Sequence, residues 1–371
     1  MHTFGIRYRI RLLEGESLEN KVAGIALEQS VELPDNVLSD EIRSAIVGRP
    51  GDSVLLSDGR HEIEIRYPIA NAAPEIVQLL NVLFGNVSLT KGVQVVDAEW
   101  DRLGSLFYGP RYGIEGVRGL LGAEKRPLSC TALKPMGFNS EELAELAYQF
   151  ALGGIDVIKD DHGLADQRYA PFEERVLAIS DAVKRANDKT GRKSVYMPNI
   201  TAGVQDVMFR MEFAVENGCG GVLLAPNLSG LEAMHVLAHE VGGVPIMAHP
   251  AFSGAYVTHP EQGFSPDFLY GGLYRALGAD FSIYPNAGGR FSFSVHECRD
   301  INDACRTPIV GYKTTFPTPG GGVKWEDIPK WAALYGNDTV FLMGGSLYQH
   351  PMGVKAAAEA VRTSLESLQS V

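Results

Sequence analysis

A lysine, two aspartates and a histidine stand side by side at the end of one apolar run, in Gly153-Gly-Ile-Asp-Val-Ile-Lys-Asp-Asp-His162. The apolar residues before them predict a buried strand. A charged cluster at the carboxyl end of a buried parallel strand is costly to desolvate, so it usually persists where the charges pair, bind a metal ion or take part in chemistry. A surface pair of Lys159 and Asp160 at the start of a loop is the simpler alternative. The elements around the cluster decide between these interpretations.

Eight short apolar or β-branched runs alternate with helical segments from about residue 127 onward. The runs are Leu128–Leu133, Ile155–Lys159, Ser194–Pro198, Gly221–Leu224, Val244–Ala248, Asp280–Tyr284, Thr314–Thr318 and Thr339–Met343, and Met352–Leu368 is a helix after the last of them. The helix predicted over Glu141–Leu152 carries its apolar residues at helical spacing from Leu143 to Phe150, which gives one face for packing on a sheet. This alternation predicts a (β/α)₈ barrel.

The sequence pattern of residues 1 to about 115 predicts a smaller unit whose strands and helices follow the order β-α-β-β-α-β. Its strands are Phe4–Leu13, Ser53–Ser57, His61–Tyr67 and Gln94–Ala98, and its helices are Asn36–Ile46 and Ala73–Phe84. Ser57-Asp-Gly59 is a hairpin signal between the middle strands. We therefore predict an α/β protein with a small α+β, ferredoxin-like domain over residues 1–115 and a TIM barrel over residues 116–371.

Composition limits the partners of this chain. The 371 residues, of which 45% are hydrophobic, can form one large core and a smaller one. The formal net charge of −12 argues against nucleic acid and against anionic membranes. The four cysteines have no CxxC or disulfide-framework spacing, and no run is long enough for a membrane helix. We expect a cytoplasmic protein that acts on a small molecule.

Polar residues follow several of the predicted strands, where barrels of this type place their catalytic groups. They are Lys134 after the first run, Lys159, Asp161 and His162 after the second, Asn199 after the third and His249 after the fifth. A satisfied core histidine is the alternative for His249, but its position after a strand favours a function. Asn286-Ala-Gly-Gly-Arg290, after the sixth run, is a flexible loop whose cation could close over a ligand.

Glycines follow the last two predicted strands. They are Gly320, Gly321 and Gly322 after the seventh run and Gly344 and Gly345 after the eighth. Glycines let backbone N–H groups approach a phosphate closely, and phosphate sites recur in these two loops of barrels. The pattern predicts a phosphorylated substrate.

With these residues in place, the chain resembles the large subunit of ribulose bisphosphate carboxylase (RuBisCO) over nearly its whole length, and specifically the non-carboxylating RuBisCO-like proteins. The segment 153–161 is similar to the family motif Gly-Gly-x-Asp-x-x-Lys-Asp-Asp-Glu, whose lysine is carbamylated and binds Mg²⁺ with the last two acids. The resemblance implies that Lys159 carries the carbamate, that Asp161 is a metal ligand and that position 162 faces the metal.

Three further segments carry the resemblance. Lys134-Pro135 resembles the catalytic Lys-Pro after the first strand, and Met247–Gly254 is similar to the Ala-His-Pro-Ala stretch of the enolase branch, which makes His249 an active-site residue. Glu28 and Asn86 match amino-domain residues that the family lends to a partner subunit's site. From the residues alone these two are turn or cap groups. The resemblance implies a homodimer, or a higher assembly of dimers.

Departures from the family pattern exclude carboxylation as the expected activity. Position 162 is His instead of a metal-binding Glu, Pro250 replaces a phosphate-binding Arg, and the sixth loop offers Arg290 instead of a catalytic Lys. His162 leaves two possibilities: the imidazole completes the shell of a divalent ion, or it acts as an acid or base. A retained Mg²⁺ with water in the gap is the preferred interpretation, because Mg²⁺ prefers oxygen ligands.

The expected activity is enolisation of a phosphorylated keto-sugar or sugar acid, by an enzyme of enolase, isomerase or decarboxylase type. Mg²⁺ between substrate oxygens favours loss of the proton beside a carbonyl, and a nearby base takes it. We assign the base to Lys134, an orienting or shuttling role to His249 and a polarising role to Asn199. A decayed relative that only binds a phosphorylated metabolite is the alternative.

Overall fold

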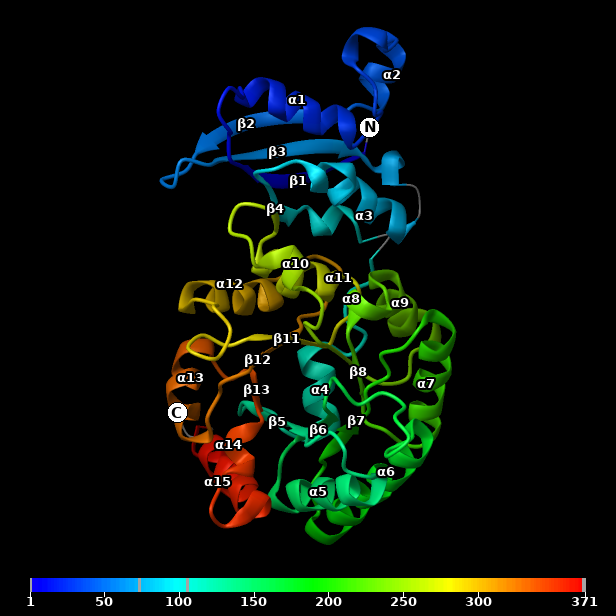
Figure 1. The fold of residues 1–371 in the computed structure, drawn as a ribbon, viewed down its shortest axis with the longest axis vertical. Helices are drawn as coiled ribbons and strands as arrows, with labels where there is room; N and C mark the ends of the chain where they lie inside the picture. The colour runs from blue at the N-terminus through cyan, green and yellow to red at the C-terminus, as the bar shows by residue number, and fades with distance from the viewer. Residues whose placement is uncertain (1, 73–74, 105–106, 369–371) are drawn as a thin grey trace.

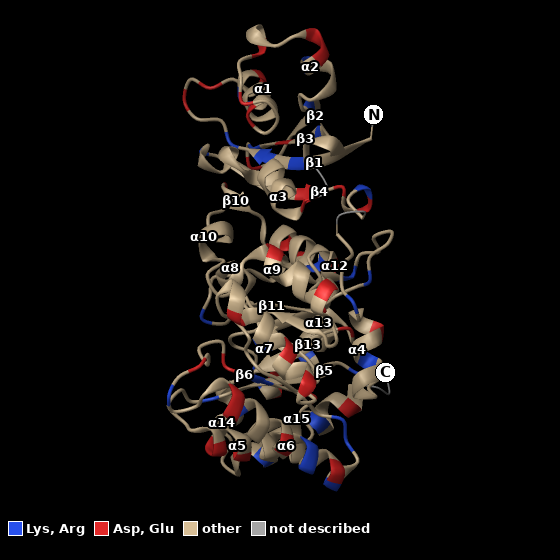
Figure 2. Ribbon diagram, turned by 90° about the vertical axis from the view of Figure 1, so that its right-hand side faces the viewer, with Lys and Arg blue, Asp and Glu red and all other residues tan. Residues whose placement is uncertain are grey.

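The computed structural model describes residues 2–72, 75–104 and 107–368, and it places a small domain at one end of the long axis and a barrel below it (Figure 1). No helix in these ranges is long and apolar enough to cross a membrane. Acidic and basic residues are interspersed over both domains, so the negative net charge is not gathered on one element (Figure 2).

The small domain is built on an antiparallel sheet with the order β4-β1-β3-β2. The strands are β1 (Thr3–Ile10), β2 (Arg49–Leu55), β3 (His61–Pro68) and β4 (Val93–Ala98). Alternate residues of β1, from Phe4 to Ile10, are fully buried, as expected for a strand with one face on a core. The Tyr8 hydroxyl donates to the Leu83 carbonyl at 3.1 Å, which ties the sheet to helix α3 (Ile76–Phe84). The ferredoxin-like prediction is confirmed for this domain.

One helix of this domain was predicted in the wrong place. The segment 36–46 forms only a 3-10 turn (Asp35–Val37) and the short helix α2 (Asp40–Ala45), neither with a buried residue. The helix that packs into the core is α1 (Leu18–Glu28), whose N-terminus is capped by the side chain of Ser17. Polar residues lie among the apolar residues of α1, so the helical spacing of its apolar residues was not recognised in the sequence. The predicted start of the next helix, at Ala73, lies outside the described residues.

In residues 107–368 the barrel contains eight parallel strands, each within two residues of its predicted bounds. They are β5 (Leu128–Leu133), β6 (Val157–Asp160), β7 (Val195–Met197), β8 (Val222–Leu224), β9 (Ile246–Ala248), β11 (Phe281–Pro285), β12 (Phe316–Gly320) and β13 (Val340–Met343). They form two ladders, β13-β5-β6-β7 and β12-β11-β9-β8. The Leu223 N–H donates to the Pro198 carbonyl and the Ile200 N–H to the Leu223 carbonyl, which joins the ladders on one side, and β12 lies against β13 on the other.

Helices form the outer ring around these strands (Figure 1). They include α5 (Ser140–Gly153), α6 (Phe172–Thr190), α7 (Val204–Glu216), α9 (Leu231–Val236), α12 (Val295–Arg306), α13 (Ile328–Tyr335) and α15 (Gly353–Ser367). Helix α4 (Gly113–Leu121) packs instead on inward-facing strand residues such as Leu128 and Val157, in a second hydrophobic cluster. It spans the predicted boundary between residues 115 and 116, which remains a prediction.

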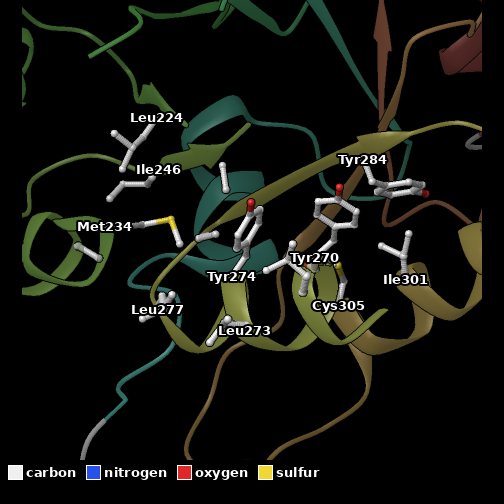
Figure 3. Close-up of a cluster of buried hydrophobic side chains, with 14 of the residues drawn as sticks. Leu224, Met234, Ile246, Tyr270, Leu273, Tyr274, Leu277, Tyr284, Ile301 and Cys305 are labelled. Atoms are coloured by element: carbon white, nitrogen blue, oxygen red, sulfur yellow. Dashed lines mark hydrogen bonds between the residues drawn. The ribbon is translucent and has the colours of Figure 1, made fainter. Parts of the chain in front are cut away.

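One sector between the strands and the ring is packed with aromatic and aliphatic side chains (Figure 3). A π-helical segment (Asp267–Leu273) and α11 (Tyr274–Ala276) carry Tyr270 and Tyr274, and Figure 3 shows Tyr274 toward Leu224 and Met234 and Tyr270 toward Cys305 of α12. Both tyrosines are almost fully buried. This packed sector supports the loop that follows β9, because the Tyr270 hydroxyl lies 2.7 Å from Ser253 Oγ in that loop.

The chain after β9 returns to the small domain. Helix α10 (Gly254–Val257) is followed by β10 (Gly263–Phe264), which pairs in parallel with β4. Figure 1 shows α10 between the two domains. The barrel therefore supplies the fifth strand of the small domain's sheet.

Candidate active site

The residues predicted to follow the strands meet at the carboxyl ends of β5, β6 and β9. Lys159 lies in β6 and is almost fully buried. Its Nζ donates to the backbone carbonyl of Asp160 at 3.0 Å. Burial lowers the pKa of the Lys159 ammonium, although Asp161 and Asp160 act in the opposite direction. The structure thus presents a buried amine with a tendency to lose its proton.

Asp160 is turned away from this amine into a buried network. Its carboxylate accepts hydrogen bonds from Arg175 Nε at 3.1 Å, from the Tyr196 hydroxyl at 2.8 Å and from the Asn199 N–H at 2.9 Å. Arg175 also donates to two backbone carbonyls of the loop after β6, those of Ala165 and Ala170. This network fixes the loop below the site, and sequence alone gave no signal for Arg175 or Tyr196.

Asp161 faces Lys134. The Lys134 Nζ lies 2.5 Å from Asp161 Oδ1, and the other carboxylate oxygen accepts from the Gly163 N–H at 3.2 Å. Burial raises the pKa of Asp161, but hydrogen bonds from His162 and Lys134 outweigh it and hold that pKa well below its usual range. Asp161 is therefore an anionic group paired with a cation from another strand.

His162 and His249 stack face to face, with ring centroids 4.5 Å apart and planes 12° apart. His162 is 47% exposed, and its Nδ1 lies 3.6 Å from Asp161 Oδ2. His249 accepts from the Ala251 N–H through Nδ1 at 3.1 Å. Burial lowers the pKa of His249, and the positive charges of Lys159 and His162 add to this effect. The neutral imidazole is thus the favoured form of His249, and the stack brings together two residues predicted separately.

Lys134 is held by a residue that sequence analysis did not identify. The Tyr348 hydroxyl, from helix α14 (Gly345–Tyr348), accepts from the Lys134 N–H at 2.8 Å and donates to the Ala132 carbonyl at 2.9 Å. The Lys134–Pro135 peptide bond is cis. The loop after the eighth strand therefore supports the loop after the first.

The polar atoms of the Asn199 side chain form hydrogen bonds with backbone groups. Its Nδ2 donates to the carbonyls of His162 and Leu164, at 3.0 and 2.8 Å, and its Oδ1 accepts from the Thr201 N–H at 3.1 Å. The side chain is almost fully buried. These contacts position the loop that carries His162, while a polarising role in catalysis stays a prediction.

The glycines of the last two loops differ in what they provide. A Cβ at Gly320 would lie 2.9 Å from the Leu342 side chain, so this glycine allows close packing of β12 on β13. Gly322 has a positive φ and lies against Gly289 of the sixth loop. Gly344 and Gly345 have open space where a Cβ would stand. The eighth loop therefore leaves room for a ligand beside its backbone.

Arg290 is exposed at the tip of the sixth loop, with its guanidinium 5.3 Å from the ring centroid of Phe291. Among the residues that the structure describes, no ion pair involves Arg290. Its predicted closure over a phosphate stays a prediction.

Glu28 and Asn86 are brought together, but in the small domain. Asn86 Nδ2 donates to Glu28 Oε1 at 3.0 Å and to Glu32 Oε1 at 2.9 Å, beside a hollow of about 240 Å³. Glu32 has a φ of 53°, an uncommon conformation for a residue other than glycine. All these partners belong to the small domain, so a single chain does not bring the pair to Lys159.

Fold and site define a (β/α)₈ barrel protein with a small N-terminal domain and a lysine–carboxylate site at the carboxyl ends of its strands. The family model of the ribulose bisphosphate carboxylase large chain, catalytic domain, matches residues 113–287. The ribulose bisphosphate carboxylase-like protein 1 of Rhodopseudomonas palustris is 38% identical over 344 residues, 92% of each chain. This chain belongs to the RuBisCO large-chain family, among its RuBisCO-like proteins.

Two curated relatives are named for reactions. A 5-methylthioribulose-1-phosphate isomerase of Rhodospirillum rubrum is 36% identical over 92% of this chain and 90% of its own. A 2,3-diketo-5-methylthiopentyl-1-phosphate enolase of Bacillus licheniformis is 33% identical over 84% of this chain and 78% of its own.

Solved structures agree with the fold. A RuBisCO-like protein from Rhodopseudomonas palustris has a TM-score of 0.89 and 35% identity, with 99% of this chain and 98% of that chain covered. A dimeric archaeal RuBisCO from Hyperthermus butylicus has a TM-score of 0.88 and 26% identity, with 99% and 91% covered.

Proposed function

We propose that this protein is an enolising enzyme of isomerase or enolase type that acts on a phosphorylated keto-sugar or sugar acid, depends on Mg²⁺ and fixes no CO₂. The observation that carries the proposal is the pairing of Lys134 with Asp161 next to the buried amine of Lys159. The relatives named for reactions are an isomerase and an enolase with phosphorylated substrates.

A metal fits this site only if Lys159 is modified. In the described part of the chain, no three His, Cys, Asp or Glu side chains are grouped so that they could hold a metal ion. Asp161 could bind a metal ion in exchange for the Lys134 ammonium, but the oxygens of Asp160 are engaged by Arg175 and Tyr196. A carbamate on Lys159 would add oxygen ligands beside Asp161, with His162 facing the same space.

The buried amine suits this modification. Carbamylation requires a neutral amine, and burial lowers the pKa of Lys159. When bound, Mg²⁺ would polarise the substrate's oxygens and make the neighbouring C–H more acidic.

Side chains and backbone groups of this protein would then have separate roles in the reaction. Lys134 follows β5 and points toward Asp161, so as a neutral amine it is placed to take the proton. The C–H bonding pair then forms the C=C bond of the enol, and the π pair of the carbonyl moves to its oxygen. His249, buried and stacked on His162, would orient the reacting groups. The open backbone at Gly344 and Gly345, together with Gly321 and Gly322 of the loop after the seventh strand, would bind the phosphate through N–H groups.

A second subunit would complete the site. Glu28 and Asn86 lie together in the small domain, and they could reach a barrel mouth across a two-fold interface. One solved RuBisCO with this fold is described as dimeric.

Proton exchange in D₂O tests the proposed activity. The protein, with Mg²⁺ and bicarbonate, is incubated with 5-methylthioribulose 1-phosphate, other phosphorylated keto-sugars and sugar acids, and deuterium uptake is followed by NMR. We expect uptake beside the carbonyl of at least one compound and no labelled bicarbonate in products of ribulose bisphosphate. Tight binding without exchange would instead support a protein that only binds a phosphorylated metabolite.

A further inference from the structure

Phe252 combines two features that a folded protein usually avoids. Its φ is +68°, in the left-handed region that is an outlier for a bulky residue. The residue is also 70% exposed, and no aromatic ring of the described residues packs against its ring. Nothing within the described structure offsets the strain and the exposure.

The loop around Phe252 is firmly held, so its conformation is built into the fold. Ser253 Oγ donates to the Pro250 carbonyl at 2.6 Å and lies 2.7 Å from the Tyr270 hydroxyl. Tyr270 belongs to the buried cluster beneath this loop (Figure 3). On the other side, the Ala251 N–H donates to His249. The loop therefore presents the Phe252 ring three residues after the stacked histidine.

The position of the loop indicates which part of a substrate it would meet. The glycines proposed for the phosphate follow β12 and β13, the seventh and eighth strands of the barrel, while Phe252 follows β9, the fifth. A substrate whose phosphate is bound by the loops after β12 and β13 would extend its other end across the mouth of the barrel. Pro250, Ala251 and Phe252 carry no charge, so this side offers an apolar surface and no cation for a second phosphate.

We propose that Phe252 is a specificity-determining residue that packs against an apolar end of the substrate, opposite the phosphate. The proposal rests on the proposed function, because that function places a phosphorylated substrate in the barrel mouth. Contact with an apolar group would remove the ring from water and offset the backbone strain.

Two probes that differ only at this end test the proposal. Ribulose 1-phosphate carries a hydroxyl where 5-methylthioribulose 1-phosphate carries a methylthio group. Calorimetry measures binding of both by the full-length protein with Mg²⁺ and bicarbonate. Wild type should bind the methylthio compound roughly 10-fold or more tightly, the discrimination typical of a small apolar group.

Phe252→Asn and Phe252→Gly should reduce this ratio to about 3-fold or less, by weakening only the methylthio compound. Both replacements tolerate a positive φ, so the melting temperature should not fall. Phe209→Ala removes another exposed phenylalanine, from α7, and should leave the ratio unchanged.

Three outcomes would overturn the proposal: an unchanged ratio, equal weakening of both probes, or dissociation of a dimer in the Phe252 variants by sedimentation. The last outcome would mean that a second copy of the chain covers this ring. Proton exchange is measured separately, so a Phe252-dependent preference without exchange would refute only the proposed function. Exchange without that preference would refute only the role of Phe252.

Discussion

The ammonium of Lys134 lies 2.5 Å from Asp161 Oδ1, so a cation already stands beside the carboxylate proposed to bind Mg²⁺. A metal ion at Asp161 would have to displace this ammonium, and Lys134 could act as a base once the displaced ammonium has released a proton to solvent. The pairing therefore couples metal binding to the availability of the base.

Lys134→Met should strengthen Mg²⁺ binding by about 10-fold and abolish proton exchange, because it removes both the competing charge and the base. Titration calorimetry in the presence of bicarbonate measures the affinity. Lys355→Met, which removes an exposed lysine paired with Glu359, is the control and should change neither quantity. Weaker Mg²⁺ binding by the Lys134 variant would show that the ammonium does not compete with the metal.

The activation of the enzyme by bicarbonate and Mg²⁺ should depend on pH in a way that reports Lys159. Only the neutral amine reacts with CO₂, and burial lowers the pKa of this group below the ordinary value of 10.5. If the dissolved CO₂ concentration is kept the same at every pH, the activation rate should therefore rise with pH and level off below pH 10.5. Preincubation at a series of pH values, followed by a rapid exchange assay, gives this profile.

Lys159→Arg should retain the fold and lose the response to bicarbonate, because guanidinium keeps the charge but cannot be carbamylated under these conditions. Wild-type exchange by this variant, or full activity after strict removal of CO₂, would rule out the carbamate.

Arg175→Met should destabilise the protein by about 3–5 kcal/mol, because it leaves the carboxylate of Asp160 buried and without its charge partner. Tyr196→Phe removes one hydrogen bond from the same carboxylate and should cost about 1 kcal/mol. Urea unfolding measures both. Arg185→Met removes an exposed pair with Asp181 and should cost under about 0.5 kcal/mol. A loss of that small size in the Arg175 variant would contradict the network.

Complementation between subunits tests whether Glu28 and Asn86 act in a partner's site. Asn86→Ala and Lys159→Ala should each be inactive, since each damages both sites of a homodimer. In a hybrid of the two variants, one site receives an intact barrel and an intact small domain. Coexpression should therefore restore about a quarter of wild-type activity, from half of the dimers with one site each. No recovery despite hybrid dimers, detected with two affinity tags, would place both residues outside the partner's site.

The barrel could be predicted because its strands are short, fully buried and regularly spaced. All eight runs were found, and the post-strand positions brought Lys134, Asp161, His162 and His249 into contact in the structure. Helix α1 was missed because its apolar stripe is interrupted by polar residues, whereas the segment 36–46 has a similar pattern without a core to pack on.

The support of the site could not be read from sequence, because it depends on contacts between distant segments. Tyr348 reaches Lys134 across 214 positions, and Arg175 reaches Asp160 from near the start of helix α6, 15 positions away. Asn199 looked like a ligand-facing residue from its position, but its amide is used on backbone carbonyls. The sequence shows which residue types follow a strand and therefore where their backbone lies. The direction of their polar atoms depends on packing against distant segments and is known only from the structure.

The pairing of β10 with β4 has a consequence for how the chain can be divided. In the intact protein β10 covers part of β4, whose backbone would otherwise be a free sheet edge. A fragment that ends before the barrel, at residue 104, would expose the N–H and C=O groups of β4 and could recruit strands from other molecules. Such a fragment should therefore self-associate, and grafting this domain elsewhere would require the residues 249–264 to travel with it.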